Sequence, residues 1–281
     1  MRFIRFIFLS FFCAAALVVF ADDDSKPVTL SETPVPVQKT INAQVGNGTL
    51  GDIDLTTNDG EIVYDAGLTA TNGDERDFTV ADDGTLLSVE VEMAETPVAV
   101  QKTIRAQALG WELEGIDKNL DDTAVSYDVE VTKDNREKDF TVDDDGTLLS
   151  MEVVPGDTPA TVQKTISTQV GGGKLTEIDQ MFDDDGVTYD VDLTAIDGQE
   201  KSFTVATNGA IVSEQMALEK ITPAAQRTVK DRIGDGKILR IDKSLLERKD
   251  GVLPYEVQGR KDGKPFDFSV GPRGRFLGMD D

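Results

Sequence analysis

The five residues Val37-Gln38-Lys39-Thr40-Ile41 occur again, unchanged, at 100–104 and 162–166, and a weaker version occupies 225–229. The glutamines of these four words are separated by 63, 62 and 63 residues. Three further landmarks keep the same spacing, and they are Tyr64, Tyr127, Tyr189 and Tyr255; Phe78, Phe140, Phe203 and Phe268; and Gly84, Gly146, Gly209 and Gly274. A constant period indicates a repeat protein, and we predict four tandem copies of one unit of about 62 residues.

Each copy is predicted to begin with a short helix. A Thr-Pro pair such as Thr33-Pro34 precedes each word, and it predicts threonine as the N-cap and proline as the first helical residue. Apolar residues then recur every four positions, as at Val37, Ile41 and Val45, and form one buried stripe. The Gln and Lys of the word lie away from this stripe, and we interpret them as solvent-facing residues that were inherited by duplication.

Four strands are predicted after each helix. In the first copy they lie at 50–55, at 62–68 with alternating apolar residues, at Phe78 and Val80, and at 87–91. Asp-Gly or Asn-Gly precedes the last strand in the first three copies, which is typical of a tight hairpin. The predicted fold class is α+β, with four tandem repeats that each pack one short helix on a four-stranded antiparallel sheet. The recurring Tyr and Phe are predicted core residues.

The landmarks also set the predicted domain boundaries. We number the copies as segments 1 to 4, and they cover 32–94, 95–156, 157–219 and 220–281. A linker is predicted at 22–31. The joints between the segments are short, so we expect neighbouring segments to stabilise one another.

The first 21 residues are predicted to be a secretory signal peptide. Arg2 and Arg5 precede an apolar run at 6–20, and Val19 and Ala21 supply the small residues that a signal peptidase needs. The run is shorter than the roughly 20 residues that span a bilayer, so no stable membrane insertion is expected. Cleavage before Asp22 would place the protein in the periplasm or outside the cell.

The composition argues against catalysis. The chain contains no histidine, and its single cysteine, Cys13, would leave with the signal peptide. The usual general acid–base group, thiol nucleophiles and common zinc sites are therefore excluded from the mature chain. No Ser/Lys pair or carboxylate pair stands out from the predicted turns. We predict a protein that is not an enzyme and has no cofactor.

The charge is strongly negative and unevenly distributed. The chain has 28 basic and 53 acidic residues, for a net charge of −25, yet residues 217–281 carry 14 basic and 11 acidic residues. Such acidity disfavours nucleic acid and anionic membranes as partners. Acidic clusters at 121–122, 143–145 and 183–185 lack the spacing of a calcium-binding EF-hand loop. We interpret them as turn residues, with weak binding of divalent cations by the acidic surface.

The order of helix, Tyr-x-Val strand, Phe-Thr-Val strand and Asp-Gly-x-Leu hairpin resembles the PepSY-like group of exported bacterial domains. This group is similar in fold to the β-lactamase inhibitor protein, and the resemblance spans about 32–281. It implies an exported, non-catalytic module that in some members inhibits secreted enzymes, and it carries over no catalytic residue. The inhibitor binds its target with aromatic side chains on the open sheet face. The same face here carries residues such as Asp65, Asp77, Asp128 and Glu130.

Two features depart from the repeat and are the candidate partner-binding residues. Trp111 stands where the other segments have glycine, and it either packs on a neighbouring segment or anchors a partner. Segment 4 is basic along its helix and first strand, at Arg227, Lys230, Arg232, Lys237 and Arg240. These cations either dock segment 4 on the acidic segment 3, which we prefer, or bind an anionic envelope polymer.

The sequence thus predicts an exported binding module of the cell envelope that binds another exported protein or an envelope polymer, and that could inhibit an enzyme. The alternative is an acidic structural or calcium-binding protein of the periplasm or cell surface.

Overall fold

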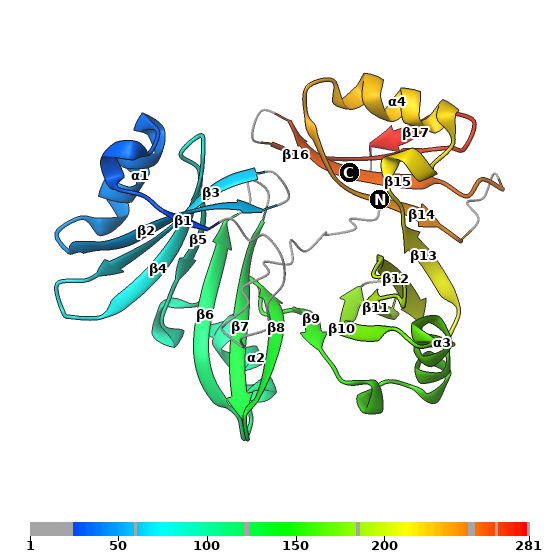
Figure 1. Cartoon of the computed structure of the whole chain (residues 1–281). Coiled ribbons are helices and arrows are strands. Elements are labelled where there is room, and N and C mark those ends of the chain that lie inside the picture. The colour runs from blue at the N-terminus through cyan, green and yellow to red at the C-terminus, as the bar shows by residue number, and fades with distance from the viewer. Residues whose placement is uncertain are drawn as a thin grey trace. The chain divides into compact units, whose positions relative to one another are not determined.

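The computed structural model describes residues 25–58, 61–120, 124–183, 186–246, 251–261 and 264–279. In this part of the chain, each of four α-helices is followed by four β-strands (Figure 1). The helices are α1 (Val35–Val45), α2 (Val98–Gln107), α3 (Ala160–Val170) and α4 (Pro223–Ile233). The fold is therefore α+β and rich in strand, as predicted.

The strands pair antiparallel with their neighbours in the chain. Those up to β8 are β1 (Lys26–Pro27), β2 (Thr49–Asn58), β3 (Glu61–Thr69), β4 (Glu75–Ala81), β5 (Leu86–Glu90), β6 (Glu112–Leu120), β7 (Val125–Lys133) and β8 (Arg136–Asp143). The others are β9 (Leu148–Glu152), β10 (Lys174–Asp183), β11 (Gly186–Thr194), β12 (Glu200–Ala206), β13 (Ile211–Gln215), β14 (Lys237–Ser244), β15 (Tyr255–Lys261), β16 (Lys264–Val270) and β17 (Phe276–Met279).

The chain divides into two compact units, which we describe separately. The N-terminal unit extends to Leu148 and contains α1, α2 and the strands up to β8. The C-terminal unit starts at Leu149 and contains α3, α4 and the strands from β10 onward. Lys26 and Pro27, in the segment predicted as a linker, form β1 and pair with β2. The predicted signal peptide at 1–21 lies outside the described residues.

Each helix covers the inner face of the strands that follow it. In α1, Val37 and Ile41 are fully buried, and the other helices bury the equivalent residues. All four recurring tyrosines and all four recurring phenylalanines are at most 6% exposed. This confirms that both landmarks are core residues. Burying such aromatic rings supplies much of the hydrophobic stabilisation of so small a unit.

The predicted helix start is wrong in the first three segments. The helices begin one residue after the proline, and the threonine hydroxyl does not cap them. Instead, Thr33 donates a hydrogen bond of 2.9 Å to the carbonyl of Leu30, three residues back, at the end of a 3-10 helix. Only Thr222 acts as an N-cap, because α4 begins at Pro223 and its hydroxyl accepts from the amide of Ala225.

The repeated word also has structural roles that the sequence pattern did not reveal. The glutamine is half-buried, and in segment 1 its amide donates to the carbonyl of Thr33 at 2.8 Å. The threonine of the word bonds the carbonyl of the hairpin glycine, at 2.6 Å between Thr103 and Gly146. That glycine has φ +88, and an added Cβ would lie 2.8 Å from the backbone of Ala99. The helix and the hairpin are thus locked together, while the lysine is exposed as predicted.

Candidate functional site

An aspartate follows the buried isoleucine on the first strand of every segment. The pairs are Ile53-Asp54, Ile116-Asp117, Ile178-Asp179 and Ile241-Asp242. A register shift precedes each pair, where one strand has an extra residue relative to its partner. Such a β-bulge lets apolar residues on either side of it face the core together. The isoleucine then points inward, and the aspartate points to the open face, away from the helix.

These aspartates meet other carboxylates on the adjacent strands. In the N-terminal unit, Asp117 is paired in register with Glu90 on β5 and with Asp128 on β7. The backbone amide of Asp77 donates to Glu90 at 3.2 Å. Burial and then the charges of Glu90, Asp128, Asp77 and Glu130 raise the pKa of Asp117 to about 6. We call Asp77, Glu90, Asp117 and Asp128 the N-terminal carboxylate row.

The C-terminal unit carries an equivalent row. Asp179 on β10 is paired in register with Glu152 on β9 and with Asp190 on β11. Asp179 is only 7% exposed. Burial and then the charges of Glu177, Asp190, Glu152 and Asp192 raise its pKa to about 8. We call Glu152, Asp179, Asp190 and Asp192 the C-terminal carboxylate row.

Arg240 reaches this C-terminal row. Its Nε lies 2.6 Å from Oδ2 of Asp242, and a third of its side chain is exposed. Burial alone would lower the pKa of Arg240, but the charges of Asp242, Asp190 and Asp192 together raise it. The guanidinium in turn acts to lower the pKa of Asp190 and Asp192, although burial still holds both above the usual range. Arg240 is therefore the resident counter-ion of these carboxylates.

Short hydroxyl side chains support the rows. The hydroxyl of Thr204 donates to Asp190 at 2.7 Å, and Ser213 bonds Thr204 at 2.8 Å. In the N-terminal unit, Thr141 donates to Asp128 at 2.7 Å. A hydrogen bond to the ionised form stabilises a carboxylate that faces other negative charges.

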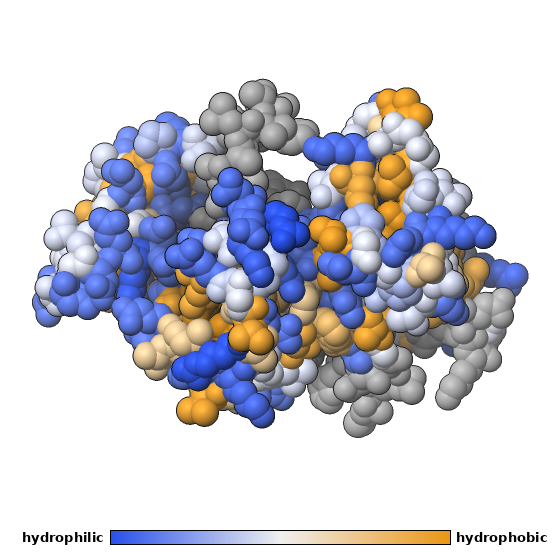
Figure 2. All heavy atoms as spheres, turned by 90° about the horizontal axis from the view of Figure 1, so that it is seen from below, coloured by the Kyte–Doolittle hydropathy of each residue, from blue (hydrophilic) through white to orange (hydrophobic). Residues whose placement is uncertain are grey.

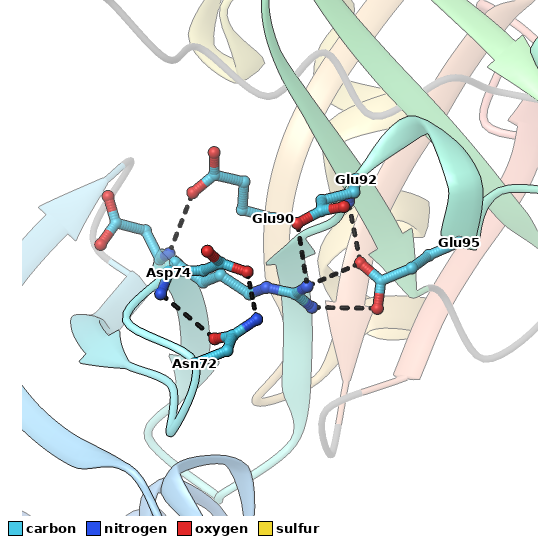
Figure 3. A network of polar contacts seen from close by, with 7 residues as sticks. Asn72, Asp74, Glu90, Glu92 and Glu95 are labelled. Atoms are coloured by element: carbon cyan, nitrogen blue, oxygen red, sulfur yellow. Dashed lines mark hydrogen bonds and ion pairs between the residues drawn. The ribbon is translucent and has the colours of Figure 1, made fainter.

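A second arginine is held by carboxylates at the end of β5. Both arms of the Arg76 guanidinium bond Glu95, at 3.0 and 2.9 Å, and one arm lies 3.8 Å from Glu92. Figure 3 shows Glu92 and Glu95 turned toward this group, with Glu90 beside them. A fork of two parallel hydrogen bonds is the strongest arrangement for an arginine and a carboxylate.

The other basic residues predicted in segment 4 do not join one surface. Arg227, Lys230 and Arg232 lie on the exposed side of α4. The Arg232 guanidinium is 3.8 Å from the centroid of the Phe276 ring, which is a cation–π contact. Lys237 is half-buried at the start of β14. Arg240 faces the acidic row, so it is oriented as the docking interpretation expects.

Trp111 lies half-buried in the turn between α2 and β6. Its ring is surrounded by three cations, Lys133, Arg136 and Lys138, which are each 5.8 to 6.0 Å from the ring centroid. These cations come from the hairpin of β7 and β8, within the same unit.

The described surface is mainly hydrophilic. On the face drawn in Figure 2, hydrophobic residues show in small groups between hydrophilic ones. Among the described residues, no group of three or more acidic side chains is arranged to hold a metal ion. The acidic pairs 121–122 and 184–185 lie outside these residues. None of the described helices is both long and apolar enough to cross a bilayer.

No family model matches the chain, and no curated protein matches it. Solved structures of Bacteroides proteins are similar to parts of it. A DUF2874 family protein from Bacteroides ovatus has 17% identity and a TM-score of 0.33, and the match covers 42% of this chain and 86% of that one. A BLIP-like protein from Bacteroides fragilis has 17% identity and a TM-score of 0.31, over 42% of this chain and 83% of that one.

A third structure comes from Bacteroides thetaiotaomicron and is described as a candidate calcium-regulated periplasmic protein. It has 19% identity and a TM-score of 0.30, and the match covers 47% of this chain and 98% of that one. The resemblance to the PepSY-like group stays a prediction.

Proposed function

We propose that this chain is an exported, non-enzymatic binding protein, built from four copies of one helix-and-sheet unit, that binds another exported protein. The carboxylate rows on the open sheet faces accept Lys or Arg side chains of that partner. Export rests on the signal-peptide pattern at 1–21. The absence of histidine and of mature cysteine supports a role in binding rather than chemistry.

The observation that carries this proposal is the contact of Arg240 with the C-terminal row. Within one folded unit, the chain itself supplies a guanidinium to Asp242, Asp190 and Asp192. Carboxylates that face each other at a half-buried surface repel, and an incoming cation relieves that repulsion. Arg240 therefore identifies the chemical group that these rows accept.

The N-terminal row has the same geometry but a different occupant position. The residue that corresponds to Arg240, directly before the Ile-Asp pair, is Gly115 in segment 2. Only acidic neighbours act on the pKa of Asp117. A guanidinium or ammonium group from a partner would fill this position and would neutralise charge that the chain leaves in place.

A peptide pair tests the proposal. An extended peptide with several arginines should bind the protein, and the same peptide with neutral citrulline in place of arginine should bind at least about tenfold more weakly. Binding is measured by calorimetry at low salt and at physiological salt, because part of the attraction is screened.

Two matched variants locate the site. Asp77→Asn with Asp117→Asn removes two charges from the N-terminal row and should weaken arginine-peptide binding about tenfold. Asp82→Asn with Asp83→Asn removes the same charge from an exposed turn and should leave binding unchanged. Equal losses in both variants would show that only net charge matters. Tight calcium binding that competes with the peptide would instead favour the cation-binding alternative.

A further inference from the structure

Trp111 occupies a position where the fold favours glycine. In the other segments, an added Cβ at Gly48, Gly173 or Gly236 would lie 2.5, 2.3 or 2.8 Å from a backbone carbonyl oxygen of the facing strand. The turn is nevertheless kept in segment 2, because the amide of Trp111 donates to the carbonyl of Ala108 at 2.9 Å. The chain around Trp111 has thus accommodated a large side chain that the repeat itself does not need.

The cations around this ring also depart from the repeat. Lys133 and Arg136 flank a two-residue turn, Asp134-Asn135, whose residues have φ of 52 and 59. In segment 1 the residues at the equivalent positions are Ala70 and Asp74, and in segment 3 they are Ala195 and Gln199. The aromatic ring and its cations therefore appear together in one segment, although they lie more than 20 residues apart in the chain.

Stabilisation of the fold does not account for three cations at one ring. An exposed cation–π contact stabilises by only about 0.5–1 kcal/mol, and like charges placed close together repel. Lys133 and Arg136 are exposed and form no ion pair with an acidic residue in the described part of the chain. Their charge is therefore available to a ligand, in a protein whose net charge is −25.

We propose that Trp111, Lys133, Arg136 and Lys138 form a binding site for an acidic sugar unit of an anionic polysaccharide. The flat indole offers an apolar face to the sugar ring, and the guanidinium fork of Arg136 matches a carboxylate. A nucleic acid fits this site less well, because the acidic sheet faces repel a long polyanion. This site is separate from the carboxylate rows and does not depend on the function proposed for them.

The single tryptophan makes the test direct, because all tryptophan fluorescence comes from the site. Titration with tetragalacturonate should change the Trp111 emission in a saturable manner, and neutral maltotetraose should not. Arg136→Gln and Lys133→Gln should each weaken tetragalacturonate binding about fivefold. Lys201→Gln, at the position in segment 3 that corresponds to Lys138, should have no effect.

The opposite results are equally clear. An unchanged emission at millimolar tetragalacturonate, or equal affinity in all three variants, overturns the proposal. Tighter binding of a single-stranded oligothymidylate than of tetragalacturonate overturns it in favour of a nucleic-acid site. Thermal unfolding of each variant checks that a lost response comes from a folded protein.

Discussion

Replacing Asp179 by asparagine removes the most perturbed carboxylate of the C-terminal row while keeping its shape. Asp179 is 7% exposed, and burial together with four acidic neighbours raises its pKa from 3.8 to about 8. The folded state therefore holds a proton at pH values where the unfolded chain has released it. Because the folded state binds more protons between about pH 4 and pH 8, the free energy of unfolding falls as the pH rises through this window.

The size of the effect follows from the two pKa values. Each pKa unit between the folded and unfolded states corresponds to about 1.4 kcal/mol, so the full penalty at pH 9 is about 5 kcal/mol. This is a large part of the stability of a typical domain. Asparagine carries no charge at any pH, so Asp179→Asn should be more stable than the wild type at pH 9 by about this amount, or by about 10 °C in Tm. At pH 4 the two proteins should be nearly equal.

Urea unfolding at pH 4, 6 and 9 measures the difference directly. Asp231→Asn, on the exposed surface of α4, removes the same charge without touching the row and should not change the pH dependence. If Asp179→Asn is less stable than the wild type at pH 9, the carboxylate is favourably paired in the folded state and the reasoning is wrong.

Three further changes test the fold and the row. Gly146→Ala should destabilise the N-terminal unit by about 2–4 kcal/mol in urea unfolding, since its φ is +88 and a Cβ would meet Ala99, whereas Gly115→Ala has free space and should be nearly neutral. Thr103→Val removes the bond to the Gly146 carbonyl and should cost about 1 kcal/mol; no loss would mean that water replaces the bond. Arg240→Gln leaves its carboxylates without a counter-ion, so it should lower stability at pH 8 by about 2–4 kcal/mol and less at pH 4, and a pH-independent loss would point to packing alone.

Much of the architecture could be predicted because a core repeats when a unit repeats. The positions of Tyr64 and Phe78 alternate with polar residues, and such a pattern has only one way to bury its apolar side. The helix start could not be predicted from Thr33-Pro34, because a 3-10 turn before the proline takes the threonine hydroxyl. A local capping motif competes here with a neighbouring turn that leaves little trace in the sequence.

The carboxylate rows were only partly visible in the sequence. Asp65, Asp77, Asp128 and Glu130 were placed on the open face by alternation alone. The recurring Ile-Asp pair was a usable signal, but its meaning depends on a β-bulge that sets which face the aspartate occupies. The neighbour of each aspartate across the sheet depends on the register between segments, which no local pattern specifies.

The site residues show the same limit. The basic side chains of segment 4 form one group in the sequence, yet Arg240 faces the acidic row while Arg227 and Lys230 lie on the helix surface. Trp111 could be singled out because it breaks the repeat. Its cations could not be, since hairpin pairing of β7 and β8 brings Lys133 and Arg136 to the ring.

The most direct test of the account supplies the N-terminal row with the cation that the C-terminal row already has. Gly115 corresponds to Arg240, and an added Cβ there meets no atom within 4 Å, so Gly115→Arg is sterically allowed. The new guanidinium should neutralise Asp117 and its neighbours. We predict that calorimetry will show binding of the arginine peptide reduced at least about tenfold relative to Gly115→Ala. Unchanged or tighter binding by Gly115→Arg would contradict the claim that these rows accept cationic side chains.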